Sequence, residues 1–492
     1  MRFRLAAILL LALVVLAQAA GPGTLTQHNE SPLISFRILF HTGAASDPVG
    51  KEGVAALTAA MLSKAGSASR SYDEIIQALF PMAASIDAQV DKEMTVFHGT
   101  THVENLEAYY GILREMLLTP GWREDDFKRL KDEAINFLRI ELRGNNEEEL
   151  GKEALYLRIY EGHPYGHHNV GSVAAIEKLT LDDLKSFYAK NFTRDNVEIA
   201  IAGGYPGGFD KRVVEDFTKL PEGKPMPVDL PAPARAKKLR VTLIEKNTRG
   251  VLISLGFPID ATRNSADWPA LSVMQSYFGQ HRTSKSYLYT RIREIRGMNY
   301  GDYAYIEYFP RGMFQFQPDP NLGRRQQIFQ IWIRPVEPQN GMFALRIALY
   351  ELNKLVNEGM TAESFEPTRK FLSKFVNLLT QTQQDRLGYA LDSRYYGIGE
   401  FNGFFKDAIG KLTVEDVNAA IKKHLRSTDL DVVVITKDAA AFRRAMQAGT
   451  PSTIQYASPP PKEILDEDKL IGRYPLDLGD VRIVPADTIF EK

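Results

Sequence analysis

The sequence predicts an α+β protein of two homologous domains, each a largely antiparallel sheet covered by helices. Three observations lead to this prediction. The chain has 492 residues, 44% of them hydrophobic, and one hydrophobic core rarely extends beyond roughly 250–300 residues. A stretch with five prolines, residues 221–238, divides the chain almost in half. An internal repeat aligns residues 176–184 without gaps on residues 409–417.

The repeat continues beyond these segments at the same offset of 233 residues. Thr180 aligns with Thr413, Asp183 aligns with Asp416, and an alternating apolar stretch follows each copy at residues 197–201 and 430–434. Each copy is typical of a helix opened by a Thr-x-x-Asp capping pattern and followed by a half-buried strand. A weaker match relates residues 124–127 to 362–365. We therefore predict duplicated copies of one domain.

The elements of the first half follow from local pattern. We predict strands over residues 35–43, 84–90 and 92–101 and helices over residues 53–65, 103–118 and 124–142. Strands that arrive in adjacent pairs, with helices grouped between them, favour an antiparallel-rich sheet. The predicted domains are residues 21–220 and 241–448, joined by a linker over residues 221–240 and followed by a C-terminal tail over residues 449–492.

Residues 1–20 are predicted to be a secretory signal peptide. Arg2 and Arg4 precede an apolar run, and Ala17-Gln18-Ala19 has the pattern of a cleavage site. The run is shorter than the ~20 residues that span a bilayer, so we expect no membrane association after cleavage; a retained short anchor is the alternative. The absence of cysteine fits a bacterial periplasm, where free thiols are prone to oxidation. We therefore expect a periplasmic protein.

The composition excludes several kinds of binding and catalytic chemistry. The formal charge of −1 gives no overall attraction to nucleic acid or anionic membrane. Without cysteine the chain has no disulfide, thiolate metal site or cysteine nucleophile. The loop that holds His163, His167 and His168 is interpreted as a turn-stabilising segment, with a weak metal site as the alternative.

A basic, tyrosine-rich segment begins at Gln280. Five basic residues and one acidic residue lie between Arg282 and Arg296. Such a surface can bind peptide backbone and carboxylates or single-stranded nucleic acid. It can also be the solvated face of an amphipathic helix that leads into a strand. The export signal and the near-zero charge make nucleic acid the least favoured of these interpretations.

The predicted helix over residues 53–65 has a face of small side chains. Ala56, Ala59 and Ala60 have the i, i+3, i+4 spacing that places them together. Here the chain resembles the pitrilysin/insulinase/mitochondrial processing peptidase family of inverted zincins. Its members carry G-x-x-His-x-x-Glu-His-Met-Leu, in which both histidines bind zinc and the glutamate activates water. The resemblance puts Ala56 and Ala60 at the histidine positions and Ala59 at the glutamate position.

Two further positions follow from the resemblance. The family's third zinc ligand is a glutamate in a downstream helix, and Phe137 stands at that position; we expect Phe137 to pack as core on the face of Leu130 and Ala134. The family pattern L-R-E-x-x-G-L-x-Y is similar to residues 292–300. In the family, the Arg and Tyr of this pattern bind the main chain of the substrate. The resemblance therefore implies that Arg293 and Tyr300 bind substrate.

These observations predict a non-catalytic subunit of a periplasmic zinc peptidase. The chain would have no catalytic residue, metal or cofactor of its own, because alanine and phenylalanine cannot hold zinc. A homologous zinc-bearing partner would supply metal, base and water, while Arg293 and Tyr300 bind an extended peptide. The alternative is a stand-alone peptide-binding or chaperone-like module without proteolysis.

Overall fold

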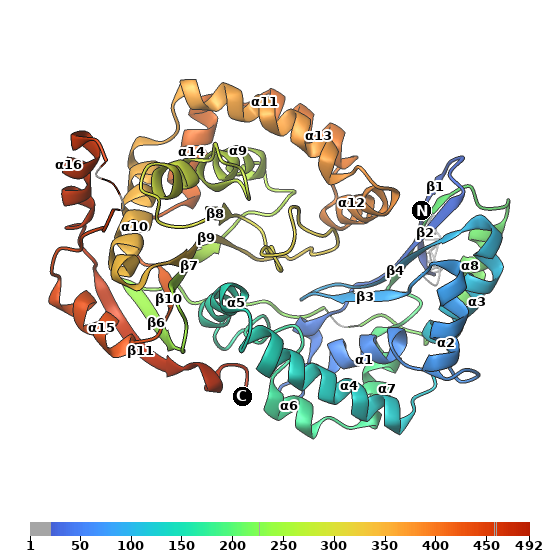
Figure 1. The fold of residues 1–492 in the computed structure, drawn as a ribbon. Coiled ribbons are helices and arrows are strands. Elements are labelled where there is room, and N and C mark those ends of the chain that lie inside the picture. The colour runs from blue at the N-terminus through green and yellow to red at the C-terminus, as the bar shows by residue number, and fades with distance from the viewer. Residues whose placement is uncertain (1–20, 226, 457, 459) are drawn as a thin grey trace, which may run out of the picture.

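The computed structural model describes residues 21–225, 227–456, 458 and 460–492 and contains one sheet in each half of the chain (Figure 1). The predicted signal peptide, residues 1–20, lies outside the described residues. No helix in the described ranges is long and apolar enough to cross a bilayer.

The first sheet has the strand order β1-β5-β2-β4-β3, and all neighbours are antiparallel except the parallel pair of β1 and β5. Its strands are β1 (Gly23–His28), β2 (Leu33–Phe40), β3 (Asp87–Val90), β4 (Thr95–His102) and β5 (Val197–Gly203). Most residues of β2 are buried, as expected for a central strand covered on both faces.

The second sheet has the order β11-β6-β10-β7-β9-β8, with β6 parallel to both β10 and β11 and the remaining pairs antiparallel. Its strands are β6 (Leu239–Glu245), β7 (Val251–Ile259), β8 (Asp302–Tyr305), β9 (Gln327–Val336), β10 (Asp431–Thr436) and β11 (Leu478–Pro485). Replacing β1–β5 by β6–β10 in order converts the first sheet into the second, and only β11 is additional. The α+β class and the duplication are thereby confirmed.

The helices repeat in the same way. The first half contains α1 (Val54–Ser63), α2 (Tyr72–Leu79), α3 (Leu106–Leu118), α4 (Glu124–Asn136), α5 (Glu147–Ile159), α6 (Val173–Lys178), α7 (Leu181–Asn191) and α8 (Phe209–Phe217). The second contains α9 (Trp268–Gly279), α10 (Gly341–Glu358), α11 (Ala362–Leu379), α12 (Gln383–Tyr396), α13 (Phe401–Gly410), α14 (Val414–His424), α15 (Ala439–Ala448) and α16 (Lys462–Ile471). The helices α3 to α8 correspond in order to α10 to α15, and α9 takes the place of α1. The helix α16 is additional, and α2 has no α-helical counterpart in the second half.

Short segments complete the chain. Two are π-helical, η4 (Phe137–Leu142) and η5 (Tyr289–Glu294). The 3₁₀ segments are η1 (Ala44–Ser46), η2 (Phe80–Met82), η3 (Val103–Asn105), η6 (Pro338–Asn340) and η7 (Ala486–Thr488). β6 already begins at Leu239, within the range predicted as linker, and β11 makes the C-terminal tail part of the second sheet.

The two halves exchange helices. α5 comes from the first half but packs on β7 and β10 of the second sheet, and α12 comes from the second half but packs on β2 and β5 of the first (Figure 1). Ile328, Val433 and Ile435 of the second sheet consequently belong to the same hydrophobic cluster as the first-half core. The halves are therefore not self-contained layers, which the sequence pattern did not indicate.

Candidate functional site

The helix α1 carries the predicted face of small side chains. Ala59 is buried, whereas Ala56 and Ala60 are partly exposed. The carboxylate of Asp47 fixes the start of the helix by accepting hydrogen bonds from the backbone N–H groups of Gly53 and Ala55, at 2.6 and 2.9 Å. A carboxylate at this end also suits the helix dipole. The face itself presents only methyl groups, which offer no ligand to a metal and no acceptor for a proton.

A loop over residues 163–171 packs closely against the start of α1. Gly53 and Gly171 both have positive φ, at 105° and 107°. A Cβ on Gly171 would lie 2.2 Å from the carbonyl oxygen of Glu52 and 2.6 Å from the Cα of Gly53. Only glycine allows the two backbones to come this close. The close contact fixes the position of the loop relative to the alanine face of α1.

The three histidines of this loop have separate partners. His163 Nε2 lies 3.0 Å from the carbonyl oxygen of Pro231, and His167 Nε2 lies 3.2 Å from the Asp47 carboxylate. His168 Nδ1 accepts a hydrogen bond from the backbone N–H two residues ahead. In the ranges that the structure describes, no three His, Asp or Glu side chains form a group able to hold a metal ion.

Phe137 does not pack as core, so that part of the prediction is wrong. The α-helix ends at Asn136, and the chain continues as the π-helical segment η4. A π-helix has more residues per turn than an α-helix, so the face of Leu130 and Ala134 is not continued. As a result 39% of Phe137 is exposed, and its ring centroid lies 5.8 Å from that of His168. An aromatic ring stands where the resemblance places the third zinc ligand.

Buried charges adjoin the histidine loop. The Lys92 ammonium donates to the carbonyl oxygen of His167, and burial lowers the pKa of Lys92 to about 7. The buried Glu153 carboxylate accepts a hydrogen bond of 2.7 Å from the Tyr308 hydroxyl, and burial raises the pKa of that carboxyl group. Sequence reasoning missed these residues, because lysine and glutamate usually lie in solvent and no local pattern distinguishes these two.

Arg293 and Tyr300 lie on either side of the connection between η5 and β8 in the second half. Arg293 belongs to η5, its side chain is 34% exposed, and its guanidinium contacts the Glu294 carboxylate at 2.6 Å and the ring of Tyr289 at 4.8 Å. Tyr300 is 79% exposed just before β8. Gly297, with φ of 62°, turns the chain between them. Among the described residues, no hydrogen bond joins the two side chains to each other or to α1.

Two family models match this chain. The model described as Insulinase (Peptidase family M16) matches residues 24–171, and the model described as Peptidase M16 inactive domain matches residues 178–372. The chain belongs to the insulinase family of peptidases. Within this insulinase-family chain, the first match includes the alanine face and Phe137, and the second includes Arg293 and Tyr300.

One of the insulinase-family relatives is named as a protein that is not a peptidase. The chain is 21% identical over 426 residues to the Non-peptidase homolog YmxG of Helicobacter pylori, covering 85% of this chain and 92% of that protein. It is 24% identical over 243 residues to the Uncharacterized zinc protease Rv2782c of Mycobacterium tuberculosis, covering 49% of this chain and 54% of that protein.

Solved structures share the fold. A peptidase M16 inactive domain from Pseudomonas fluorescens superposes with a TM-score of 0.73 at 24% identity, covering 85% of this chain and 96% of the other. The periplasmic protease PqqL from Escherichia coli superposes with a TM-score of 0.67 at 15% identity, covering 94% of this chain and 50% of PqqL. With alanine and phenylalanine at the zinc-motif positions, this chain is a zinc-less member of the insulinase family.

Proposed function

We propose that this chain is the non-catalytic subunit of a periplasmic zinc peptidase, in which a homologous partner supplies the zinc site. The observation that carries the proposal is the combination of inert residues at Ala56, Ala59, Ala60 and Phe137 with an intact, accessible Arg293 and Tyr300. The Helicobacter relative is named a non-peptidase homolog, which supports the absence of peptidase activity. PqqL of Escherichia coli is a periplasmic protease, which supports the location.

Arg293 and Tyr300 have the chemistry that the role requires. The guanidinium has five N–H donors and the phenol has one O–H donor, and Tyr300 makes no side-chain hydrogen bond in the described part of the chain. Both can therefore donate to the carbonyl oxygens of a peptide or to a developing oxyanion. Removing one donor at such a position typically lowers the rate by about 10²–10³-fold.

An extended peptide also fits a free strand edge. β8 is not free on its outer side, because the Gln275 amide donates to the Ala304 carbonyl at 2.8 Å and α9 packs beside the strand. β3 is an edge strand beside α1 with mostly half-buried residues, and within the described ranges its backbone pairs only with β4. Strand addition at β3 would give a peptide main-chain hydrogen bonds without constraining its sequence.

The test combines metal analysis with kinetics. We expect the purified chain alone to hold no stoichiometric zinc and to cleave no peptide, and to support chelator-sensitive cleavage when mixed with a zinc-bearing homologue from the same organism. In that mixture Arg293→Ala and Tyr300→Phe should each lower kcat by about 10²–10³-fold while co-purification is kept.

The control is Arg444→Ala, which removes an exposed arginine on α15 and should leave kcat unchanged. Chelator-sensitive proteolysis by the isolated chain would overturn the proposal. Unchanged kinetics in the two variants would reject the role of Arg293 and Tyr300.

A further inference from the structure

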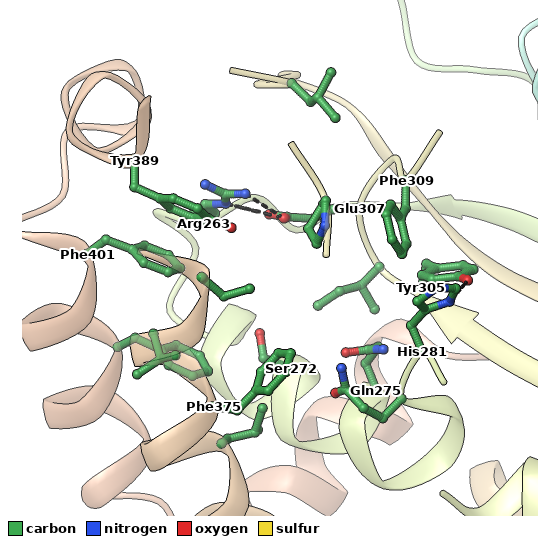
Figure 2. Close-up of a pocket in the computed structure, with 18 of the residues that line it drawn as sticks. Arg263, Ser272, Gln275, His281, Tyr305, Glu307, Phe309, Phe375, Tyr389 and Phe401 are labelled. Carbon is green, nitrogen blue, oxygen red and sulfur yellow. Dashed lines mark hydrogen bonds and ion pairs between the residues drawn. The ribbon is translucent and has the colours of Figure 1, made fainter. Parts of the chain in front are cut away.

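A separate cavity of about 140 Å³ lies in the second half, between α9, α11, α13 and the chain that leaves β8 (Figure 2). The helices around this cavity are the second-half counterparts of the helices around the zinc-motif positions. α9 takes the place of α1, which carries three of the zinc-motif positions, and α11 takes the place of α4, which is followed directly by the fourth at Phe137. When residues 124–127 are aligned with 362–365, Phe375 on the cavity wall is at the position equivalent to Phe137 in the sequence repeat.

The walls of the cavity are largely aromatic. Phe375, Tyr389 and Phe401 stand on one side, and Tyr305 and Phe309 stand on the other (Figure 2). The wall rings pack against one another at centroid distances of 4.5 Å for Tyr389 with Phe401 and 5.3 Å for Tyr305 with Phe309. Such walls favour a flat, apolar ligand.

The charged groups on the wall are neutralised within the protein. The Arg263 guanidinium pairs with the carboxylates of Glu307 and Asp392, at 3.0 and 3.1 Å. The Asp319 carboxylate, also on the wall, pairs with the Arg311 guanidinium. Because these groups already have partners of opposite charge, the cavity does not select an ion.

The side chain of Gln280 offers a polar group to a ligand in the cavity. Gln280 lines the cavity and is only 8% exposed, yet its side-chain amide makes no hydrogen bond in the part of the chain that the structure describes. Gln275 uses its amide N–H on the Ala304 carbonyl and keeps its side-chain oxygen as an acceptor. The Gln280 amide therefore has an unused donor and an unused acceptor at the cavity wall, and a ligand that reaches it with a hydroxyl group would form a hydrogen bond.

We propose that this cavity binds one aromatic side chain of the peptide, with tyrosine preferred. The volume matches a single ring, since an apolar protein cavity of about 150 Å³ accepts benzene. The aromatic walls would hold the ring, and the Gln280 amide would bind the phenol hydroxyl. This inference rests on the proposed peptide-binding function and adds to it a side-chain preference located away from the zinc-motif face.

The experiment measures binding of three labelled pentapeptides of alanine, with tyrosine, phenylalanine or alanine at the centre, to the isolated chain. Burial of one ring should make the tyrosine and phenylalanine peptides bind about 10- to 100-fold more tightly than the alanine peptide. Val376→Phe, which fills the cavity from α11, should abolish that difference. Leu378→Phe, on the exposed side of the same helix, is the matched control and should retain it.

A second variant tests the proposal even if Val376→Phe does not fold. Gln280→Leu should remove the preference for tyrosine over phenylalanine and leave phenylalanine binding intact. Equal binding of all three peptides by the native chain, while its complex with the zinc-bearing homologue cleaves peptides, would overturn the pocket and leave the proposed function standing. A ring preference in the isolated chain without any cleavage by the complex would reject the function and retain the pocket.

Discussion

His168 packs as an aromatic side chain beside Phe137, one of the four zinc-motif positions. Its ring packs between Phe137 and Phe490, at centroid distances of 5.8 and 5.4 Å, and only 8% of the residue is exposed. Burial, with a smaller contribution from the nearby Lys92 charge, lowers the pKa of His168 to about 3. The imidazole is therefore neutral at physiological pH and packs as an aromatic side chain.

This burial predicts an acid-sensitive contribution to stability. Between the ordinary pKa of histidine, about 6.5, and the folded pKa of about 3, the unfolded chain binds a proton that the folded chain does not. The free energy of unfolding should fall as pH drops through this window, by up to about 1.4 kcal/mol per pH unit from this residue. His168→Asn keeps an acceptor for the backbone N–H and should flatten that part of the pH profile, measured by urea unfolding at a series of pH values.

The control for this prediction is His102→Asn. The His102 side chain is 40% exposed, so its replacement should leave the steepness of the profile nearly unchanged. An equal slope in native protein and His168→Asn would contradict the assignment.

At the scale of elements, the duplicated helices α7 and α14 begin with the same device. The Thr180 hydroxyl accepts from the backbone N–H of Asp183, and the Asp183 carboxylate accepts from the backbone N–H of Thr180. Thr413 and Asp416 make the same reciprocal pair. A capping box of this kind satisfies two of the N–H groups that a helix start leaves unpaired.

The duplication predicts matched costs for removing the two caps. Thr180→Ala and Thr413→Ala should each lower the free energy of unfolding by about 1 kcal/mol, because the lost hydrogen bonds are the same. Thr180→Ser and Thr413→Ser keep the accepting oxygen and should lose much less. Chemical denaturation of the four variants checks this, and a cost confined to one helix would show that the two caps are not equivalent.

At the scale of the whole molecule, a buried ion pair joins the two halves. Arg324, from the segment between β8 and β9, contacts Asp91, from the turn between β3 and β4, at 2.8 and 2.5 Å. The two side chains are 2% and 0% exposed. Burial is the largest single influence and would raise the pKa of Asp91. The charge and hydrogen bonds of Arg324, with smaller contributions from Asn169 and Lys92, together outweigh burial and hold the pKa of Asp91 below its ordinary value.

Breaking this pair should destabilise the whole chain. Arg324→Met leaves Asp91 as an unpaired buried charge, and such a loss typically costs about 3–5 kcal/mol. Replacing both residues, as in Arg324→Met with Asp91→Leu, removes the unpaired charge and should recover much of the loss. The free energy of unfolding in urea measures both effects.

The neighbouring residue provides a matched control. Arg325 pairs with Glu93 at 2.5 Å, but its side chain is 48% exposed, so Arg325→Met should cost less than about 1 kcal/mol. Equal costs for the two arginine variants would contradict a special role for the buried pair.

Much of the site could be predicted from the sequence because its signals are local. The spacing of Ala56, Ala59 and Ala60 indicates one helix face whatever surrounds it, and the structure has that helix. The exposure of Phe137 could not be predicted, because the change from α- to π-helix at that residue is not visible in the side-chain pattern. The cavity near Gln280 was also missed, since its walls come from segments more than 100 residues apart.

The amino-acid pattern was sufficient to predict two copies of an α+β domain, their helix caps, and a zinc-motif face without ligands. The caps and the helix face depend on residues a few positions apart, whose hydrogen bonds and periodicity act within one element. The duplication is visible because the same local patterns recur 233 residues later. Three features became visible only in the folded chain: α5 and α12 exchange sheets, Asp91 and Arg324 form a buried pair between the halves, and His168 is buried against Phe137. Those outcomes depend on burial and charge summed over distant segments, which no local pattern records.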